Sequence, residues 1–170
     1  MTFMGRLGAL DNEPVIHDDE YRLGVGDSLK IQVYGEPDLN IEARIGEKGL
    51  ISYPFLGTIE VLGMTSVELE KYIIEGLKGD YLVNPEVAVH IMEYRKFFVN
   101  GEVRSPGGFP YQPGITVHKA ISLAGGFSER ASRDKIYIVR ENSSNRKAVK
   151  AALDTRISPG DIITVEESFF

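Results

Sequence analysis

Alternating apolar and polar positions in the first half of the chain predict short strands joined by tight turns. Leu29, Ile31 and Val33 stand at every second position after Ser28, between polar neighbours. This period of two is typical of a strand with one buried face. Further strands, separated by turns that contain glycine or proline, are expected over residues 41–45, 50–53, 58–62 and 87–92.

A helix is predicted between the fourth and fifth of these strands. Thr65 and Glu68 have the spacing of a capping box, in which each side chain accepts a hydrogen bond from the other residue's backbone N–H. Leu69, Ile73 and Leu77 follow at intervals of four and predict one buried stripe.

The second half of the chain predicts a different order: strand, strand, helix, then more strands. A hairpin is expected from residues 97–103 and 109–112, with Pro106 and Gly107 in its turn. The next helix should start at the cap Thr116 and end at Gly125 and Gly126, where glycine tolerates the left-handed conformation. The remaining strands are expected over residues 135–140, 149–151 and 162–165. This order is typical of a β-grasp domain, a sheet folded over one helix, so the predicted class is α+β with a domain boundary near residues 94–96.

Two segments of the chain share a turn followed by a strand, LGVGDSLKIQV at residues 23–33 and ISPGDIITVEE at residues 157–167. Gly26-Asp27 and Gly160-Asp161 each place a carboxylate beside a turn, where it can accept hydrogen bonds from backbone N–H groups. A catalytic pair of carboxylates would need a shared cleft and separated pKa values, which the sequence does not indicate. We therefore expect turn-stabilising roles, with no catalytic, cofactor-binding or metal-binding residues.

Composition narrows the possible functions. The chain has 170 residues, 42% of them hydrophobic, which is enough for one large or two small domains with their own cores. A net charge of −6 argues against sequence-independent binding of nucleic acid, which depends on clustered cations. No apolar run approaches the ~20 residues of a membrane helix, and the absence of cysteine excludes disulfides and thiolate chemistry. Residues 1–20 lack periodicity and a signal-peptide pattern, so we expect a flexible segment and either a cytosolic protein or a targeting segment missing from this sequence.

The ordered motifs resemble the bacterial outer-membrane polysaccharide export family, the Wza-like proteins. The motifs that carry the resemblance are YRLGVGDSLKIQVYGEPDL (21–39), GLISYPFLGTIEVLGMTSVELE (49–70), YLVNPEVAVHIMEYR (81–95), GEVRSPGGFP (101–110), LAGGF (123–127) and SPGDIITV (158–165). The resemblance implies a small β-rich polysaccharide export domain with one helix over residues 21–95. It implies an SLBB domain, a β-grasp module named for soluble ligand binding, over residues 96–167.

The resemblance also implies a function and partners. Subunits of this family form a ring around a channel through which polysaccharide passes, without making or breaking bonds and without a cofactor. The implied partners are the polysaccharide, an inner-membrane copolymerase that regulates chain length, and further copies of the chain. The implied location is the periplasm, with possible outer-membrane association. Pore-forming members are longer, so we expect a minimal member or soluble fragment that is a monomer or small oligomer in dilute solution.

Candidate contact residues follow from the chemistry of a conduit, which needs weak contacts with sugars or between subunits. Aromatic faces stack on the C–H edges of sugars, and the candidates are Tyr53, Tyr81, Tyr94 and Tyr111, although tyrosine at strand ends more often packs with a wet hydroxyl. Tyr94, Arg95 and Lys96 form a basic and aromatic cluster at the inferred domain junction. This cluster could contact acidic sugars, but we favour a hinge and a subunit contact.

Three other functions stay open at this point. A soluble module that binds a glycan or small ligand would need an apolar pocket with convergent polar groups. A polysaccharide hydrolase would need paired acids at hydrolase spacing, which no local motif provides. A ubiquitin-like carrier would need a free Gly-Gly tail, whereas this sequence ends in Phe169-Phe170.

Overall fold

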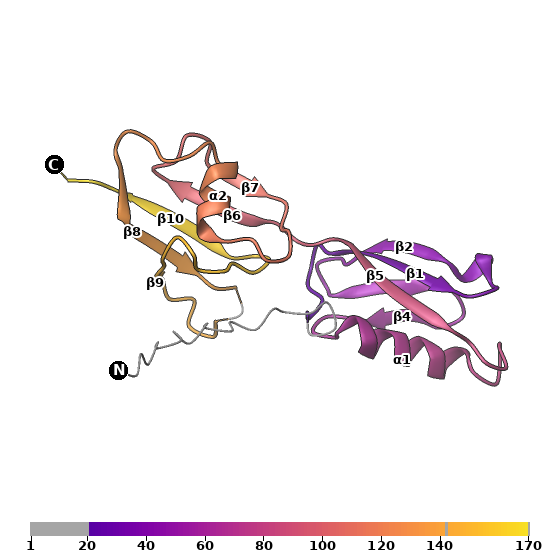
Figure 1. The fold of residues 1–170 in the computed structure, drawn as a ribbon. Coiled ribbons are helices and arrows are strands. Elements are labelled where there is room, and N and C mark those ends of the chain that lie inside the picture. The colour runs from indigo at the N-terminus through magenta and orange to yellow at the C-terminus, as the bar shows by residue number, and fades with distance from the viewer. Residues whose placement is uncertain (1–20, 142, 170) are drawn as a thin grey trace, which may run out of the picture.

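The protein forms two units, each with its own hydrophobic core, in a computed structural model that describes residues 21–141 and 143–169 (Figure 1). These residues contain two α-helices, ten strands in three sheets and one short 3-10 helix. The predicted α+β class is therefore confirmed. The flexible segment expected over residues 1–20 lies outside the described residues.

The first unit combines a three-stranded antiparallel sheet of order β2-β1-β5 with a β3-β4 hairpin and one helix. Its elements are β1 (Ser28–Val33), η1 (Pro37–Leu39), β2 (Ile41–Arg44), β3 (Leu50–Tyr53), β4 (Gly57–Glu60), α1 (Ser66–Leu77) and β5 (Val87–Glu93). The alternation predicted for β1 is confirmed, since Leu29, Ile31 and Val33 are buried.

Helix α1 begins and packs as its sequence predicts. The Glu68 N–H donates to Thr65 Oγ1 at 3.2 Å, and the Thr65 N–H donates to Glu68 Oε2 at 3.1 Å, which completes the capping box. Such a cap stabilises a helix by about 1 kcal/mol. Leu69, Ile73 and Leu77 are fully buried and join the core of the first unit.

The second unit is a five-stranded mixed sheet of order β7-β6-β10-β8-β9, in which β6 and β10 are parallel and the other pairs antiparallel. Its elements are β6 (Phe97–Gly101), β7 (Gly107–Phe109), α2 (Val117–Leu123), β8 (Ala131–Val139), β9 (Val149–Lys150) and β10 (Ile162–Glu167). Helix α2 lies over the sheet (Figure 1), and its buried Val117, Ala120 and Ile121 belong to the core of this unit. The expected sheet around a single helix is thus present.

Two details of the second unit differ from the sequence prediction. Strand β8 begins at Ala131, four residues earlier than expected, and pairs there with Glu167 beyond a bulge in β10. Its first five residues are mostly polar and have no apolar alternation, which is why the sequence pattern does not predict them as a strand. The second strand of the hairpin, expected over residues 109–112, is instead β7 at Gly107–Phe109, so that Gly107, expected in the turn, begins the strand and pairs with Val99.

Gly101 explains how β6 and β10 end beside each other. Its φ is +84°, and a Cβ at this position would overlap the backbone carbonyl oxygen of Val165 on β10. Only glycine allows both this backbone conformation and so close an approach between two strands.

The two units are joined directly, because β5 continues through residues 94–96 into β6 (Figure 1). None of the helices in the described ranges combines the length and the apolar character needed to cross a membrane.

Candidate functional site at the junction of the two units

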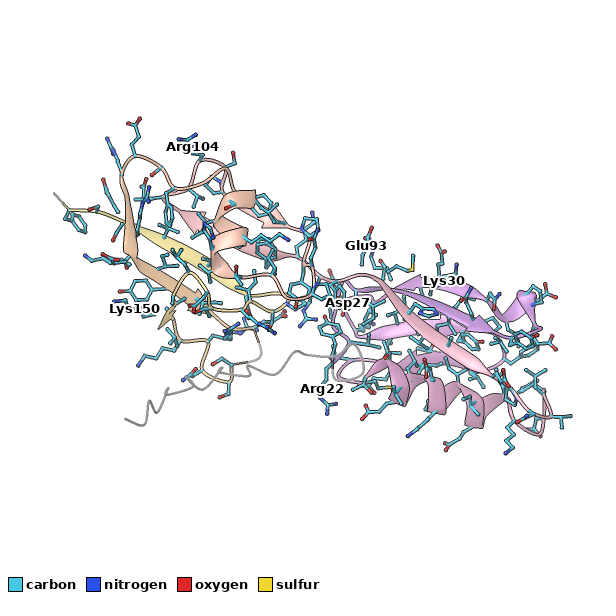
Figure 2. All side chains as sticks on the ribbon, in the orientation of Figure 1. Arg22, Asp27, Lys30, Glu93, Arg104 and Lys150 are labelled. Carbon is cyan, nitrogen blue, oxygen red and sulfur yellow. The ribbon has the colours of Figure 1, made fainter. Side chains whose placement is uncertain are left out.

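The first Gly-Asp turn is organised around the side chain of Asp27, which lies where the two units meet (Figure 2). Asp27 is fully buried. Its carboxylate accepts hydrogen bonds from the Gly24 N–H at 2.8 Å, the Tyr21 hydroxyl at 2.8 Å and the Arg95 N–H at 2.6 Å. Gly26 supplies the positive φ, +94°, that the turn requires. Asp27 therefore fixes the start of β1, the segment before it and Arg95, the second residue after β5.

The second Gly-Asp turn repeats this chemistry with Asp161, which is also buried. The Ser158 N–H donates to Asp161 Oδ2 at 2.7 Å, across the same three-residue interval that separates Gly24 from Asp27. The Glu141 N–H donates to Oδ1 at 3.3 Å, and the Arg140 guanidinium donates to Oδ2 at 2.7 Å. Both buried carboxylates are thus held by several donors, as charged groups in an interior must be.

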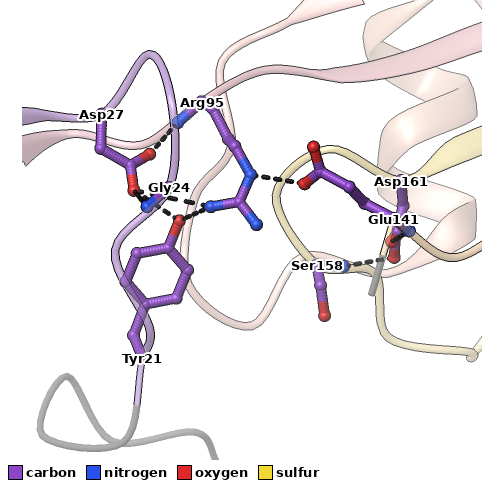
Figure 3. A network of polar contacts seen from close by, with 7 residues as sticks. All are labelled: Tyr21, Gly24, Asp27, Arg95, Glu141, Ser158 and Asp161. Atoms are coloured by element: carbon purple, nitrogen blue, oxygen red, sulfur yellow. Dashed lines mark hydrogen bonds and ion pairs between the residues drawn. The ribbon is translucent and has the colours of Figure 1, made fainter. Parts of the chain in front are cut away.

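Arg95 connects the two turns (Figure 3). Its Nη1 lies 3.5 Å from Asp27 Oδ2 and donates to the Tyr21 hydroxyl. Its Nε donates to Glu141 Oε2 at 2.5 Å, and the backbone of Glu141 donates to Asp161. A continuous series of polar contacts therefore runs from Asp27 in the first unit to Asp161 in the second.

The ionisation of Tyr21 and Arg95 follows from this environment. Burial raises the pKa of the Tyr21 hydroxyl, and the negative charge of Asp27 raises it further, so that Tyr21 remains a neutral donor. Burial by itself would lower the pKa of Arg95, but Tyr21, Glu141 and Asp27 outweigh that effect and raise it. The junction therefore contains a permanently charged guanidinium between anionic groups.

Aromatic rings form a second series of contacts across the junction. Tyr21 and Tyr94 meet edge to face with ring centroids 4.9 Å apart, and Tyr94 meets Tyr111 of the second unit in the same way at 5.3 Å. Edge-to-face pairs at such distances are favourable because the positive edge of one ring meets the negative face of the other. The polar and aromatic contacts together restrict the relative motion of the two units.

Glycine permits two close approaches at the junction. A Cβ on Gly160 would overlap Glu141 Oε2, and a Cβ on Gly24 would meet the Arg95 guanidinium. The Gly160 N–H also donates to the Lys96 carbonyl at 3.0 Å. The glycines of both turns are therefore needed for the contacts between turns as well as for the turns themselves.

An open cleft of about 790 Å³ lies beside the junction. This volume is within the range of ligand-binding pockets. Its lining combines cationic, aromatic and amide side chains with one carboxylate of each unit, and includes Arg44, Glu93, Arg95, Lys96, Phe98, Tyr111, Gln112 and Glu141. Arg44 and Glu93 form an exposed ion pair of 3.0 Å at its edge. The cleft therefore offers a mixed polar and aromatic surface to a ligand.

Four of the predicted contact residues lie together in this cleft, namely Tyr94, Arg95, Lys96 and Tyr111. Tyr53 does not: its side chain is 2% exposed in the core of the first unit, and its hydroxyl donates to the Leu39 carbonyl at 3.0 Å. The expectation that Tyr53 contacts a glycan or another subunit is wrong, because its ring has no accessible face.

No local sequence pattern indicates that Tyr21 and Glu141 take part in the contacts of the junction. Tyr21 is the first residue of the motif over residues 21–39, and Glu141 follows β8 at a distance of 46 residues from its partner Arg95. The contacts of Tyr21 depend on the packing of the first unit and that of Glu141 on the packing of the two units, for which no local pattern is diagnostic.

The described residues contain no group of three His, Asp or Glu side chains placed to hold a metal ion. Asp27 and Asp161 belong to different turns and each is occupied by hydrogen-bond donors. Their arrangement is that of structural carboxylates.

Comparison with known proteins assigns both units to described families. Residues 16–92 match the family described as polysaccharide biosynthesis/export protein, and residues 96–149 match the SLBB domain. The two matches follow one another along the chain in the same order as the two units of the structure.

Curated relatives extend this similarity. The chain is 34% identical over 158 residues to the exopolysaccharide production protein ExoF of Rhizobium meliloti (strain 1021), across 82% of this chain and 36% of that protein. It is 26% identical over 181 residues to the EPS I polysaccharide export outer membrane protein EpsA of Ralstonia nicotianae (strain ATCC BAA-1114 / GMI1000), across 86% of this chain and 47% of that protein. It is 27% identical over 126 residues to the polysialic acid transport protein KpsD of Escherichia coli, across 72% of this chain and 23% of that protein. The chain thus spans less than half the length of each of these relatives.

Proposed function

The chain belongs to the polysaccharide export family, and we propose that it serves as a non-catalytic component of a machinery that exports exopolysaccharide or capsule. The observation that carries this proposal is the ordered match of the two units to the export family and the SLBB domain. Relatives named for exopolysaccharide production, polysaccharide export and polysialic acid transport support it.

A non-catalytic role agrees with the chemistry of the buried carboxylates. Asp27 and Asp161 each accept hydrogen bonds from backbone N–H groups and lie beside an arginine. A general acid or base must instead reach the proton that it transfers. We assign both residues to the stability of the turns and of the junction.

We propose the cleft as a place of weak contact with the exported chain. Tyr111 offers a ring surface, while Lys96 and Arg44 offer donors to hydroxyl or carboxylate groups of a sugar. A conduit functions only if each contact is weak, since a tightly held polysaccharide would not move. Arg95 itself is 12% exposed and engaged with Asp27 and Glu141, so its main role is to hold the two units together.

The wider setting belongs to the same proposal. The component would be periplasmic or associated with the outer membrane, would assemble with further copies into a ring, and would receive the polysaccharide from an inner-membrane copolymerase. The support for this setting is the family membership and the name of the outer membrane relative.

Deletion of the gene, followed by quantification of cell-surface and intracellular polysaccharide, tests the proposed function. We expect the surface polysaccharide to be lost and to return when the wild-type gene is supplied. Unchanged surface polysaccharide in the deletion strain would contradict the proposal.

The second candidate function is a soluble module that binds a glycan or small ligand, favoured by the SLBB match and by the size of the cleft. This function predicts tight binding of one free compound at the cleft. A thermal-shift screen with mono- and oligosaccharides separates this function from a role in a conduit, because a conduit component should show only small increases in melting temperature. Lys96→Ala should abolish the shift if the compound occupies the cleft.

A further inference from the structure

We infer that Phe55 and Tyr81 form a second carbohydrate contact, a stacking platform for one pyranose ring of the polysaccharide. This inference rests on the proposed function. The two rings stack with centroids 4.6 Å apart and an interplanar angle of 26°. They are 63% and 47% exposed, respectively, although both are large apolar side chains.

The platform lies at the end of the first unit that is remote from the junction. Phe55 is in the turn between β3 and β4, and Tyr81 follows α1 on the way to β5. A Cβ on Gly76 near the end of α1 would meet the Leu56 side chain, which places the turn beside the end of this helix. Since β5 leads from this end to the second unit (Figure 1), the platform and the cleft are separate sites.

The backbone of Phe55 shows that its exposure has a cost. Its φ of +64° lies in the left-handed region, which is a genuine outlier for a bulky residue. Glycine would adopt this conformation without strain, and the exposed ring gains little burial in return. Strained residues tend to occur at functional sites, because selection keeps them there for reasons other than stability.

The size of the platform favours a sugar over a protein partner. Because an aromatic side chain offers about 150–250 Å² of surface, the two rings together expose on the order of 200 Å². A stable protein interface needs roughly 800 Å² from each partner. Among the exposed residues that flank the rings in the chain, Thr58, Asp80 and Asn84 are polar and Val83 is apolar. An aromatic face edged by polar groups suits a pyranose, which has C–H bonds on its face and hydroxyl groups around its rim.

Phe55→Gly separates function from fold, because it removes the ring and also the backbone strain. The surface polysaccharide purified from the same strain, partially hydrolysed to oligosaccharides, is the probe, and binding is followed by amide chemical shifts. We expect Phe55→Gly and Tyr81→Ala to weaken binding roughly two- to tenfold, the effect of losing one aromatic contact. The melting temperature of Phe55→Gly should equal or exceed that of the wild type.

Two further variants serve as controls. Tyr72→Ala removes an exposed tyrosine from α1 and should leave binding unchanged. Phe55→Trp keeps an aromatic face, and because the chain has no tryptophan its emission reports on the platform alone. We expect Phe55→Trp to bind as the wild type does and its emission to shift on addition of the oligosaccharides.

The inference is overturned if the wild type shows no chemical-shift change near Phe55 and Tyr81, or if Phe55→Gly binds as well as the wild type. It is also overturned if Phe55→Gly changes the sedimentation coefficient but not binding, because the platform would then be a subunit contact. In the deletion strain, full export with Phe55→Gly would refute the platform and leave the proposed function intact. Failure of the deletion itself to affect export would refute the proposed function.

Discussion

The Nε of Arg95 lies 2.5 Å from Oε2 of Glu141, and this contact joins a residue at the end of the first unit to one in the second. The same guanidinium lies 3.5 Å from the buried Asp27 carboxylate. One side chain therefore both neutralises an interior charge and links the units, so its loss should have two effects that other variants can separate.

Arg95→Met should lower the free energy of unfolding by about 3 kcal/mol or more, because the buried Asp27 carboxylate would lose its cationic partner. Urea unfolding of the two proteins measures this difference. Glu141→Gln is the matched control: the Glu141 side chain is 42% exposed, so its loss of charge should cost less than about 1 kcal/mol. Equal losses in the two variants would contradict the assignment of Arg95 to Asp27.

Glu141→Ala should loosen the junction without unfolding either core. It removes the acceptor of Arg95 Nε in the second unit and leaves the contacts of Arg95 with Asp27 and Tyr21 in place. Small-angle X-ray scattering should show a larger radius of gyration and a broader distribution of interatomic distances than the wild type. An unchanged scattering curve would mean that the tyrosine contacts alone fix the angle between the units.

Asp27→Asn should be more destabilising than Asp161→Asn. In both turns the amide NH₂ of the introduced asparagine would face hydrogen-bond donors. Asp27 is fully buried, so its donors would be left without a partner. The Arg140 partner of Asp161 is 38% exposed, so water can still hydrate it. We expect a loss of about 1–2 kcal/mol for Asp161→Asn and about 3 kcal/mol for Asp27→Asn, measured by chemical denaturation. Glycan binding should survive in Asp161→Asn, and a folded variant without binding would overturn the structural role.

The stability of the protein should fall at alkaline pH through Tyr21. Its pKa is raised in the folded state, while a tyrosine in the unfolded chain ionises near pH 10. Above about pH 10 the folded state therefore binds more protons than the unfolded state, and stability falls by up to about 1.4 kcal/mol per pH unit.

Tyr21→Phe isolates this contribution, because Tyr53, whose pKa burial also raises, is present in both proteins. The stability difference between wild type and variant should be constant up to about pH 9 and should narrow above about pH 10. A difference that does not change with pH would show that Tyr21 is not held neutral.

Gly101→Ala should cost clearly more stability than Gly126→Ala. Both glycines have a positive φ, +84° and +87°, so each substitution introduces backbone strain of about 1 kcal/mol or more. At Gly126 the added Cβ meets nothing within 4 Å, whereas at Gly101 it overlaps the Val165 carbonyl. We expect Gly101→Ala to cost about 1–3 kcal/mol more, as overpacking does, and thermal unfolding of both variants measures it.

Local elements of this fold could be predicted because their signals lie within a few residues. The Thr65 cap and the Leu69, Ile73 and Leu77 stripe required only the helical period, and the strand at Ser28 required only alternation. The start of β8 could not be predicted in this way, because Ala131 pairs with Glu167 of β10 across a bulge, and this backbone pairing places no demand on the polarity of the residues that follow.

The junction could be predicted only in part, for the same physical reason. The motif Tyr94, Arg95 and Lys96 indicated a basic cluster, and each Gly-Asp pair indicated a turn with a side-chain acceptor. The contact of Arg95 with Asp27 spans 68 residues within the first unit, and its contact with Glu141 spans 46 residues and crosses to the second unit. Neither contact follows from a local sequence pattern. Tyr53 is a candidate for stacking on sugars because it is a tyrosine at a strand end, but the pleat of β3 turns its ring into the core.

The link through Arg95 is one of the contacts that hold the angle between the units, and that angle has a meaning beyond the single molecule. Identical copies that associate head to tail close into a ring only when each copy rotates the next by a fixed fraction of a full turn. If the two units of each copy moved freely relative to one another, the copies would associate into rings of many sizes or into open filaments. A salt bridge between the two units would therefore influence the curvature of any closed assembly that this chain forms. The curvature in turn sets the number of copies in the ring.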